Sequence, residues 1–438
     1  MRMIPALIIA VLSVQPVSTE NVRLLITPFR DLTGQETQWI GLAVQATLVS
    51  DLGSRRGVSV ISEEDRIAAL KEMEFQLTGL AQEEGQAKVG RLMGANVLLH
   101  GEYAVADGQI RFTARMTSVE TGEVLNAVKS TGKLEDIFNV QDRLVADILK
   151  QFARDGSALE PRLDTAASAP PTPPRKLEFY EAFGKGLAEE QAGHRRAANA
   201  AFRQAHKIEP SNLEVVFKLA FNCLQIGEPV EADRLLAEAL KRIKAEPTAA
   251  EPTAVSRIYF ALGRLAYDRK DTEGELRWFL AASEALSAQP VDQWKAKVTV
   301  RLGEAYRHLS RNVKQGGDLG RALAMFEQAR GQYEQLGLTR TLDYAQLLRS
   351  FGNYYMNMRD EADAETYFRK CMELLKALGQ ETSGGYADLL HSLAELNRTF
   401  RRRDAMLGYY KAAAALYDKL GMRSRAAEVR QKANETRR

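Results

Sequence analysis

The sequence predicts a multidomain protein in which a small α/β domain with a mixed sheet precedes an all-α superhelix of repeated helix pairs. In residues 21–155, strand-like apolar runs alternate with helix-like runs, and hairpin turns join the later strands. That order is typical of a small α/β domain. In residues 177–421, small and large apolar positions recur at fixed intervals, which indicates a stack of similar helix pairs.

Residues 1–20 have the composition of an export signal. Arg2 gives a positive start, Ile4 to Val14 form an apolar run, and polar residues follow at 18–20. The apolar run is shorter than the roughly 20 residues that span a bilayer. We therefore expect a cleaved signal peptide, a periplasmic or secreted mature chain, and no transmembrane helix in it. No cysteine lies near the expected cut, so lipidation is not expected. The alternative is a buried N-terminal strand or helix.

The elements of the α/β domain are predicted from apolar spacing and turns. Strands are expected at residues 22–28, 58–61, 97–105, 110–116 and 124–129, and helices at 39–52, 62–73, 87–93 and 134–152. Apolar residues from Ile110 to Met116 alternate with polar ones, so this strand is expected to bury one face. Asp107-Gly108 and Thr121-Gly122 supply the turns between the last three strands.

Several motifs of residues 21–155 carry a family resemblance. They are ITPFRDLTG, WIGLAVQATLVSDL, GVSVISEEDRIAALKEME, KVGRLMGANVLLHGEY and SVETGEVL. Together they resemble the amino-terminal domain of the TolB family and the periplasmic domain of the CsgG family. The resemblance implies a role in envelope assembly and protein contact, with docking on envelope machinery or oligomerisation. The CsgG pore needs long strand-forming segments and a lipidated cysteine, so we do not expect pore formation.

The repeat region begins after the linker, residues 156–176, whose run of prolines at 170–174 is expected to be extended and semi-rigid. Four small or large positions recur after 34 residues, pairing Gly186, Ala198, Phe202 and Ala205 with Ala220, Ala232, Leu236 and Ala239. Later units repeat every 42 residues, as in Phe326, Phe368 and Tyr410. The region resembles the tetratricopeptide repeat (TPR) family, with about six units. Residues 422–438 are expected to form a polar capping helix.

The first helix of each pair is expected to line a concave groove, because stacked helix pairs form a superhelix. Counting from the small positions gives these groove candidates: Tyr180, Phe183, Phe217, Phe221, Arg257, Phe260, Arg264, Tyr267, Arg307, Arg349, Asn353 and Arg398. The groove thus begins aromatic and ends polar, with five arginines. Guanidinium groups pair bidentately with carboxylates, so an acidic or C-terminal peptide segment would suit the groove.

Arg349 and Asn353 stand four residues apart and are similar to part of the carboxylate clamp of chaperone-binding TPR domains. Ser392 stands where that family would place an asparagine, so the clamp is incomplete. The structural alternative for each single residue is a solvated charge on a scaffold. We expect function from the groove as a surface rather than from any one of its residues.

Signatures of catalysis, of metal binding and of nucleic-acid binding are missing from the sequence. It has neither the phosphate-binding loop nor the nucleophile turn of the common enzyme families. Cys223 and Cys371 fall on small, buried repeat positions without a further ligand at metal spacing, so neither a metal nor a disulfide framework is expected. The net charge of +3 is too small to indicate nucleic acid. No cofactor is expected.

We therefore expect a non-enzymatic, exported envelope scaffold that binds protein partners in the repeat groove. One alternative is a cytoplasmic, non-catalytic signalling module, since TolB-like domains also precede tetratricopeptide repeats in regulatory proteins. A second alternative is an enzyme with an unrecognised site. That enzyme would need convergent polar groups in the α/β domain, and the sequence gives no sign of them.

Overall fold

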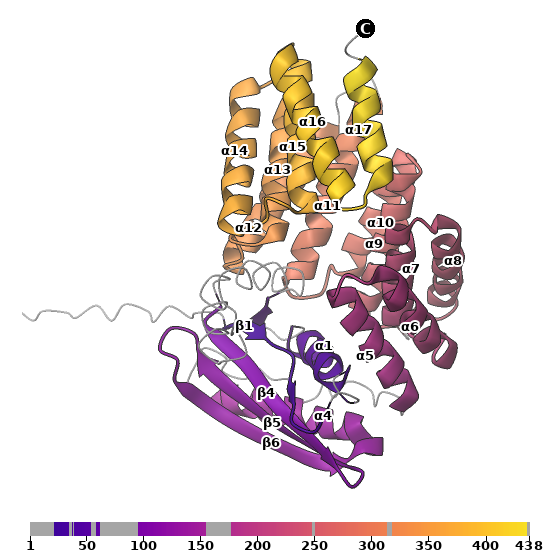
Figure 1. The fold of residues 1–438 in the computed structure, drawn as a ribbon, viewed down its shortest axis with the longest axis vertical. Coiled ribbons are helices and arrows are strands. Elements are labelled where there is room, and N and C mark those ends of the chain that lie inside the picture. The colour runs from indigo at the N-terminus through magenta and orange to yellow at the C-terminus, as the bar shows by residue number, and fades with distance from the viewer. Residues whose placement is uncertain are drawn as a thin grey trace, which may run out of the picture.

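The computed structural model describes residues 22–34, 37, 39–53, 58–61, 95–154, 177–247, 250–312 and 318–435. The expected signal peptide, the linker at 156–176 and the helices expected at 62–73 and 87–93 lie outside these residues. A sheet with two helices forms one part, and a curved stack of helices forms the other (Figure 1). The predicted fold class, an α/β domain followed by a TPR-like superhelix, is confirmed.

The sheet is mixed, as predicted. Its strands are β1 (Val22–Ile26), β2 (Arg30–Asp31), β3 (Val58–Val60), β4 (Val97–Ala106), β5 (Gln109–Ser118) and β6 (Val124–Lys133). Their order is β3-β1-β4-β5-β6, and the short β2 pairs with β4. The first strands run parallel, whereas β4, β5 and β6 form an antiparallel meander.

One face of the sheet is buried under α1 (Trp39–Gly53) and α4 (Ile137–Arg154). The alternation predicted for β5 is confirmed, since Ile110, Phe112 and Ala114 are fully buried while Gln109 and Arg111 are exposed. The sequence missed β2, which is too short to show a period. The last helix begins after a short 3-10 turn (Leu134–Asp136) rather than at residue 134.

The rest of the described chain forms thirteen helices in the order of the repeats. They are α5 (Leu177–Gln191), α6 (Arg195–Ile208), α7 (Leu213–Ile226), α8 (Pro229–Ala245), α9 (Pro252–Asp268), α10 (Thr272–Ala285), α11 (Gln293–Asn312), α12 (Asp318–Gln335), α13 (Leu342–Asn357), α14 (Glu361–Ala377), α15 (Gly384–Thr399), α16 (Arg403–Lys419) and α17 (Arg423–Glu435). These helices make six pairs and a final single helix.

The small repeat positions are small because an aromatic ring of the paired helix lies against them. A methyl group at Gly303 would come within 2.6 Å of the Phe326 ring, and one at Gly352 within 2.5 Å of the Phe368 ring. Both rings are fully buried. The glycines therefore let the two helices of a pair approach closely, which explains the repeated glycine–phenylalanine pattern in the sequence.

Polar caps set the helix boundaries between paired helices. Asp271 and Asp360 accept hydrogen bonds from the backbone N–H groups of Gly274 and Asp363 and so satisfy free donors of α10 and α14. Each cap follows a residue in the left-handed region, Lys270 or Arg359. The 42-residue units end in Leu-Gly, where Gly337, Gly379 and Gly421 have positive φ.

The two parts pack directly against each other. Helix α1 lies along α5, and the side chain of Arg23 in β1 donates a hydrogen bond of 3.1 Å to the backbone oxygen of Gly337, between α12 and α13. Leu25 and Leu98 of the sheet belong to the same buried apolar cluster as residues of α9 to α13. The α/β domain thus contacts the first repeat through α1, and its sheet contacts the fourth–fifth junction (Figure 1).

Candidate functional site

The inner face of the superhelix is built by the first helices of the pairs. Helix α7 contacts α9, α11 contacts α13, and α13 contacts α15. The Phe217 ring of α7 also lies 6.0 Å from the Trp294 ring of α11, although a whole repeat separates the two helices along the chain. Only the concave side of a curved stack brings such helices together. Phe217 and Trp294 therefore mark the inner face.

The aromatic end of this face lies on α7, α9 and α11. Phe217 and Phe221 lie 5.7 Å apart, and both are half-buried. Phe260 packs 4.8 Å from Trp294, and the Arg257 guanidinium lies over the same indole at 5.6 Å. These four rings and the guanidinium form a surface that offers both apolar area and hydrogen-bond donors. Phe260 itself is almost fully buried and supports the others.

Of the two residues expected at the start of the groove, the structure contradicts one. Tyr180 is 1% exposed and packs between Trp39 of α1 and Phe138 of α4. Its hydroxyl accepts a hydrogen bond from Gln141. The prediction that Tyr180 lines an open groove is therefore wrong, because the α/β domain covers it. Phe183 is half-buried and stacks on Phe179 within the first repeat.

The centre of the inner face holds a buried carboxylate. Glu304 of α11 accepts hydrogen bonds from Gln346 and Ser350 of α13, at 3.0 and 2.7 Å, and from Arg301 at 2.7 Å. Burial alone would raise the pKa of Glu304, but the positive charges of Arg301 and Arg349 hold it well below its usual range. A charge buried this far stays ionised only when it is paired, so the cluster fixes α11 against α13.

The same arrangement recurs at the C-terminal end. Asp388 of α15 forms an ion pair of 2.6 Å with Arg425 of α17 and accepts a hydrogen bond from Tyr417. Burial opposes ionisation, yet Arg349 and Arg425 keep the pKa of Asp388 below its ordinary value. Two turns further along α15, Glu395 accepts a 2.8 Å hydrogen bond from the Tyr410 hydroxyl of α16. The Asp388–Arg425 pair joins α17 to α15 as the next helix of the inner face, and the two tyrosines join α16 to α15.

The predicted arginines are largely paired within the chain. Arg257 forms an ion pair with Glu214, Arg264 with Asp268, and Arg398 with Glu395. These pairs neutralise much of the positive charge expected for an acidic ligand.

The remaining two arginines have different surroundings. Arg307 is buried and donates a 2.8 Å hydrogen bond to His308, whose other ring nitrogen faces Glu275. Arg349 donates to the side-chain oxygen of Gln346 and is half-buried. No carboxylate of the described residues lies within ion-pair distance of Arg349, although its charge helps to keep Glu304 and Asp388 ionised.

The partial clamp is not open to solvent as a unit. Asn353 lies one turn along α13 from Arg349 and is 7% exposed. Ser392 of α15 is also 7% exposed. Tyr267, by contrast, is 44% exposed at the end of α9, with its ring 5.3 Å from the His308 ring and the Arg264 guanidinium over it. The accessible polar groups are therefore Tyr267, Arg264, Arg349 and Arg398 rather than the full predicted set.

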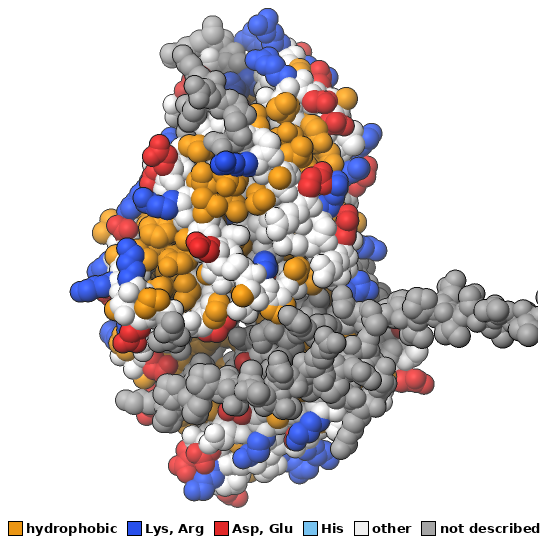
Figure 2. Space-filling view, turned by 180° about the vertical axis from the view of Figure 1, so that it is seen from behind, with side chains coloured by type: hydrophobic (Ala, Val, Ile, Leu, Met, Phe, Trp, Pro, Cys, Tyr) orange, Lys and Arg blue, Asp and Glu red, His pale blue; other side chains and the backbone are white. Residues whose placement is uncertain are grey.

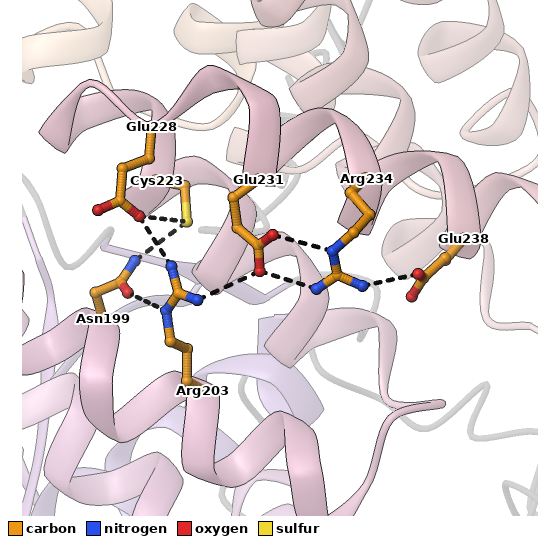
Figure 3. A network of polar contacts seen from close by, with 7 residues as sticks. All are labelled: Asn199, Arg203, Cys223, Glu228, Glu231, Arg234 and Glu238. Carbon is orange, nitrogen blue, oxygen red and sulfur yellow. Dashed lines mark hydrogen bonds and ion pairs between the residues drawn. The ribbon is translucent and has the colours of Figure 1, made fainter.

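A second polar network lies where α6, α7 and α8 meet (Figure 3). Arg203 donates to Asn199 at 2.7 Å and pairs with Glu228 at 2.9 Å, while Arg234 joins Glu231 to Glu238. The Asn199 amide donates to the Cys223 thiol. Burial raises the pKa of Cys223, so the thiol stays protonated. This network ties neighbouring repeats together and offers no reactive group.

Residues important to the inner face that the prediction omitted are Trp294, Arg301 and Arg425. Counting at the offset that gave Phe260 reaches Val300 in the fourth unit, so it passes over Trp294, which stands at the start of α11. Arg425 was assigned to a solvated cap, although it completes the pair with Asp388.

Within the described part of the chain, no cluster of His, Cys, Asp or Glu has the arrangement of a metal site, and no helix has the length and hydropathy of a membrane span.

Apolar side chains also gather on the surface of the helical part. On the face opposite to that of Figure 1, they form patches over the repeats, interrupted by charged groups (Figure 2). Patches of this kind are typical of protein-contact surfaces.

Comparisons with known proteins concern the fold. No family model matches this sequence, and no curated protein matches it. Among solved structures, the Rap protein complexed with Competence and Sporulation Factor is 14% identical, with a TM-score of 0.43 over 67% of this chain and 83% of that one. PilF of Pseudomonas aeruginosa is 19% identical, with a TM-score of 0.36 over 55% and 92%. The C-terminal domain of LpoB from Salmonella enterica is 17% identical, with a TM-score of 0.23 over 26% and 84%.

Proposed function

We propose that this chain is a non-catalytic scaffold of the bacterial cell envelope that binds an extended protein segment on the inner face of its repeats. The observation that supports this function best is the aromatic surface of Phe217, Phe221 and Trp294, which the fold leaves half-buried beside Arg257. A rigid aromatic surface next to a guanidinium is the kind of site on which binding energy concentrates. The helices that carry it are already packed, so little ordering is needed on binding.

The ligand we infer is an extended segment with apolar residues at one end and a carboxylate further along. Its apolar side chains would contact Phe217 and Phe221, and its carboxylate would meet Arg349, which donates to Gln346 and forms no direct ion pair among the described residues. Arg257, Arg264 and Arg398 are paired with carboxylates of the chain itself, so a strongly acidic ligand would gain less binding energy than five arginines suggest. A segment with one or two carboxylates fits the face better than a polyacidic one.

Export and a docking role for the α/β domain belong to the same proposal. The signal-like residues 1–20 and the TolB- and CsgG-like motifs support it. The direct packing of the sheet on the repeats supports a coupled role, because a partner held by one part would be presented next to the other.

Cell fractionation with N-terminal sequencing of the mature chain tests the envelope role. We expect the tagged protein in the periplasmic fraction, with an N-terminus near residue 20. A chain that starts at Met1 in the cytosol would overturn export. Deleting residues 4–14 serves as the matched control and should leave the protein in the cytosol.

A further inference from the structure

Among the residues that the structure describes, no strand pairs with the outer edge of β6. Strand β6 pairs with β5 on one side only and is the last strand of the sheet (Figure 1). The N–H of Leu134 donates to the backbone oxygen of Gly108. In an antiparallel ladder this pairing alternates, so the backbone N–H and C=O groups of even-numbered β6 residues point toward β5, and those of odd-numbered residues point outward. The Thr131 oxygen agrees with this alternation, since it accepts a bond from the Arg143 side chain rather than from β5. The backbone groups of Ala127 and Lys129 therefore point away from the sheet.

Positive charge surrounds this edge. Lys129 and Arg111 lie on the same open face of neighbouring strands, and both are exposed. Arg143 of α4 reaches the edge from the other side. Lys133 is paired with Glu135, but no carboxylate of the described residues lies within ion-pair distance of Lys129, Arg111 or Arg143.

Exposed apolar side chains stand at the start of the strand. Val124 is 51% exposed and Leu125 is 47% exposed, which is unusual for large residues of a sheet. Edge strands are generally protected from other chains, and lysine is a common means of protection. In β6 the lysines, Lys129 and Lys133, stand in the second half of the strand. Its first half, with Val124 and Leu125, is uncharged and can contact apolar side chains of an added strand.

We propose that the β6 edge binds an extended, carboxylate-bearing segment of another protein as an added strand. The outward N–H and C=O groups of Ala127 and Lys129 would pair with its backbone, and its carboxylates would meet Lys129, Arg111 and Arg143. A second copy of this chain fits less well, because antiparallel pairing of two β6 strands places Lys129 and Lys133 of both copies on one face. This site rests on the proposed docking role of the α/β domain and lies apart from the inner face of the repeats.

Binding of a defined peptide to the full chain tests this site. The probe is a fluorescein-labelled peptide of alternating threonine, valine and glutamate, and its affinity is measured by fluorescence anisotropy. Ala127→Pro removes an outward N–H without removing a bond to β5, and Lys129→Glu inverts the charge. We expect each variant to weaken binding by about tenfold, the effect of losing one backbone or charge-assisted bond.

The controls separate this site from the inner face and from misfolding. Lys150→Glu changes an equally exposed lysine of α4 and should leave binding unchanged. The same peptide with N-methylated backbone groups should bind at least about tenfold more weakly. Phe221→Ala should not affect this probe, so a failure here leaves the inner-face proposal intact. Unchanged binding by Lys129→Glu, or dimers that Ala127→Pro abolishes, would overturn the proposal.

Discussion

Gly352 shows how one missing methyl group sets the geometry of a repeat. The ring of Phe368 occupies the space that a side chain at Gly352 would need. We expect Gly352→Ala to lower the free energy of unfolding by about 1–3 kcal/mol, because the core must shift to accept the methyl group. Denaturant unfolding of the two proteins measures this difference.

A second helical glycine provides the matched control. Gly408 of α16 is exposed, and nothing lies within 4 Å of the position that its methyl group would take. Gly408→Ala should therefore stabilise the chain by about 0.5–1 kcal/mol, since alanine loses less backbone entropy in a helix. Equal effects at the two positions would show that close helix approach does not explain the glycine pattern.

Glu304 makes stability depend on pH in a specific direction. Because its folded pKa lies below the ordinary value of 4.5, the ionised side chain stabilises the fold above that pH. This contribution is lost as the pH falls toward the folded pKa. Glu304→Gln should cost on the order of 3 kcal/mol at pH 7, and the cost should shrink below about pH 4.

Urea midpoints of both proteins across this pH range measure the effect. Glu373→Gln, at an exposed position of α14, should leave the midpoint unchanged at every pH. A cost for Glu304→Gln that stays constant from pH 7 to acid would contradict the ionised, paired state of Glu304.

At the scale of elements, the apolar periods predicted most of what the structure contains. The strands at β4 and β5, the six helix pairs and the final helix α17 all follow from spacing and turns. Periodicity could not reveal β2, because a strand of two residues shows no repeat and forms only by pairing with β4. Nor could it show that the groove arginines are neutralised, since Glu214 and Arg257 meet only after the superhelix curves.

Helix α17 illustrates an element whose role was only partly predicted. It covers the last repeat through Ala426 and Val429, and it supplies Arg425 to Asp388. Removing residues 423–438 should expose the apolar side chains of α16 and leave Asp388 buried without its partner. We expect increased binding of a hydrophobic dye and self-association in sedimentation.

A shorter truncation serves as the control for that experiment. Removing residues 436–438 alone leaves α17 whole. A monomer with unchanged dye binding is expected from it. If the longer truncation also behaves in this way, α17 is not the cap of the superhelix.

At the scale of the whole molecule, the two parts are joined by more than the linker. Tyr180 of the first repeat packs against Trp39 and Phe138 of the α/β domain, with ring distances of 5.7 and 4.9 Å. The sequence placed Tyr180 in an open groove because counting within one repeat cannot see a neighbouring domain. The packing predicts that the two parts unfold together.

Tyr180→Ala should separate them. We expect a loss of about 3–5 kcal/mol from the lost ring contacts and two calorimetric transitions in place of one. Tyr180→Phe keeps the ring and should cost only about 1 kcal/mol with a single transition. Two transitions in the unaltered protein would contradict the coupling.

The central claim is that the inner face of the repeats holds a protein partner in the envelope. Photo-crosslinking in cells tests it most directly, with the reactive residue at Phe221 on the inner face or at Val230 on α8, which is 81% exposed. We predict a discrete heavier product from position 221 in the periplasmic fraction and none from position 230. A product from position 230 alone, or none from position 221, would contradict the account.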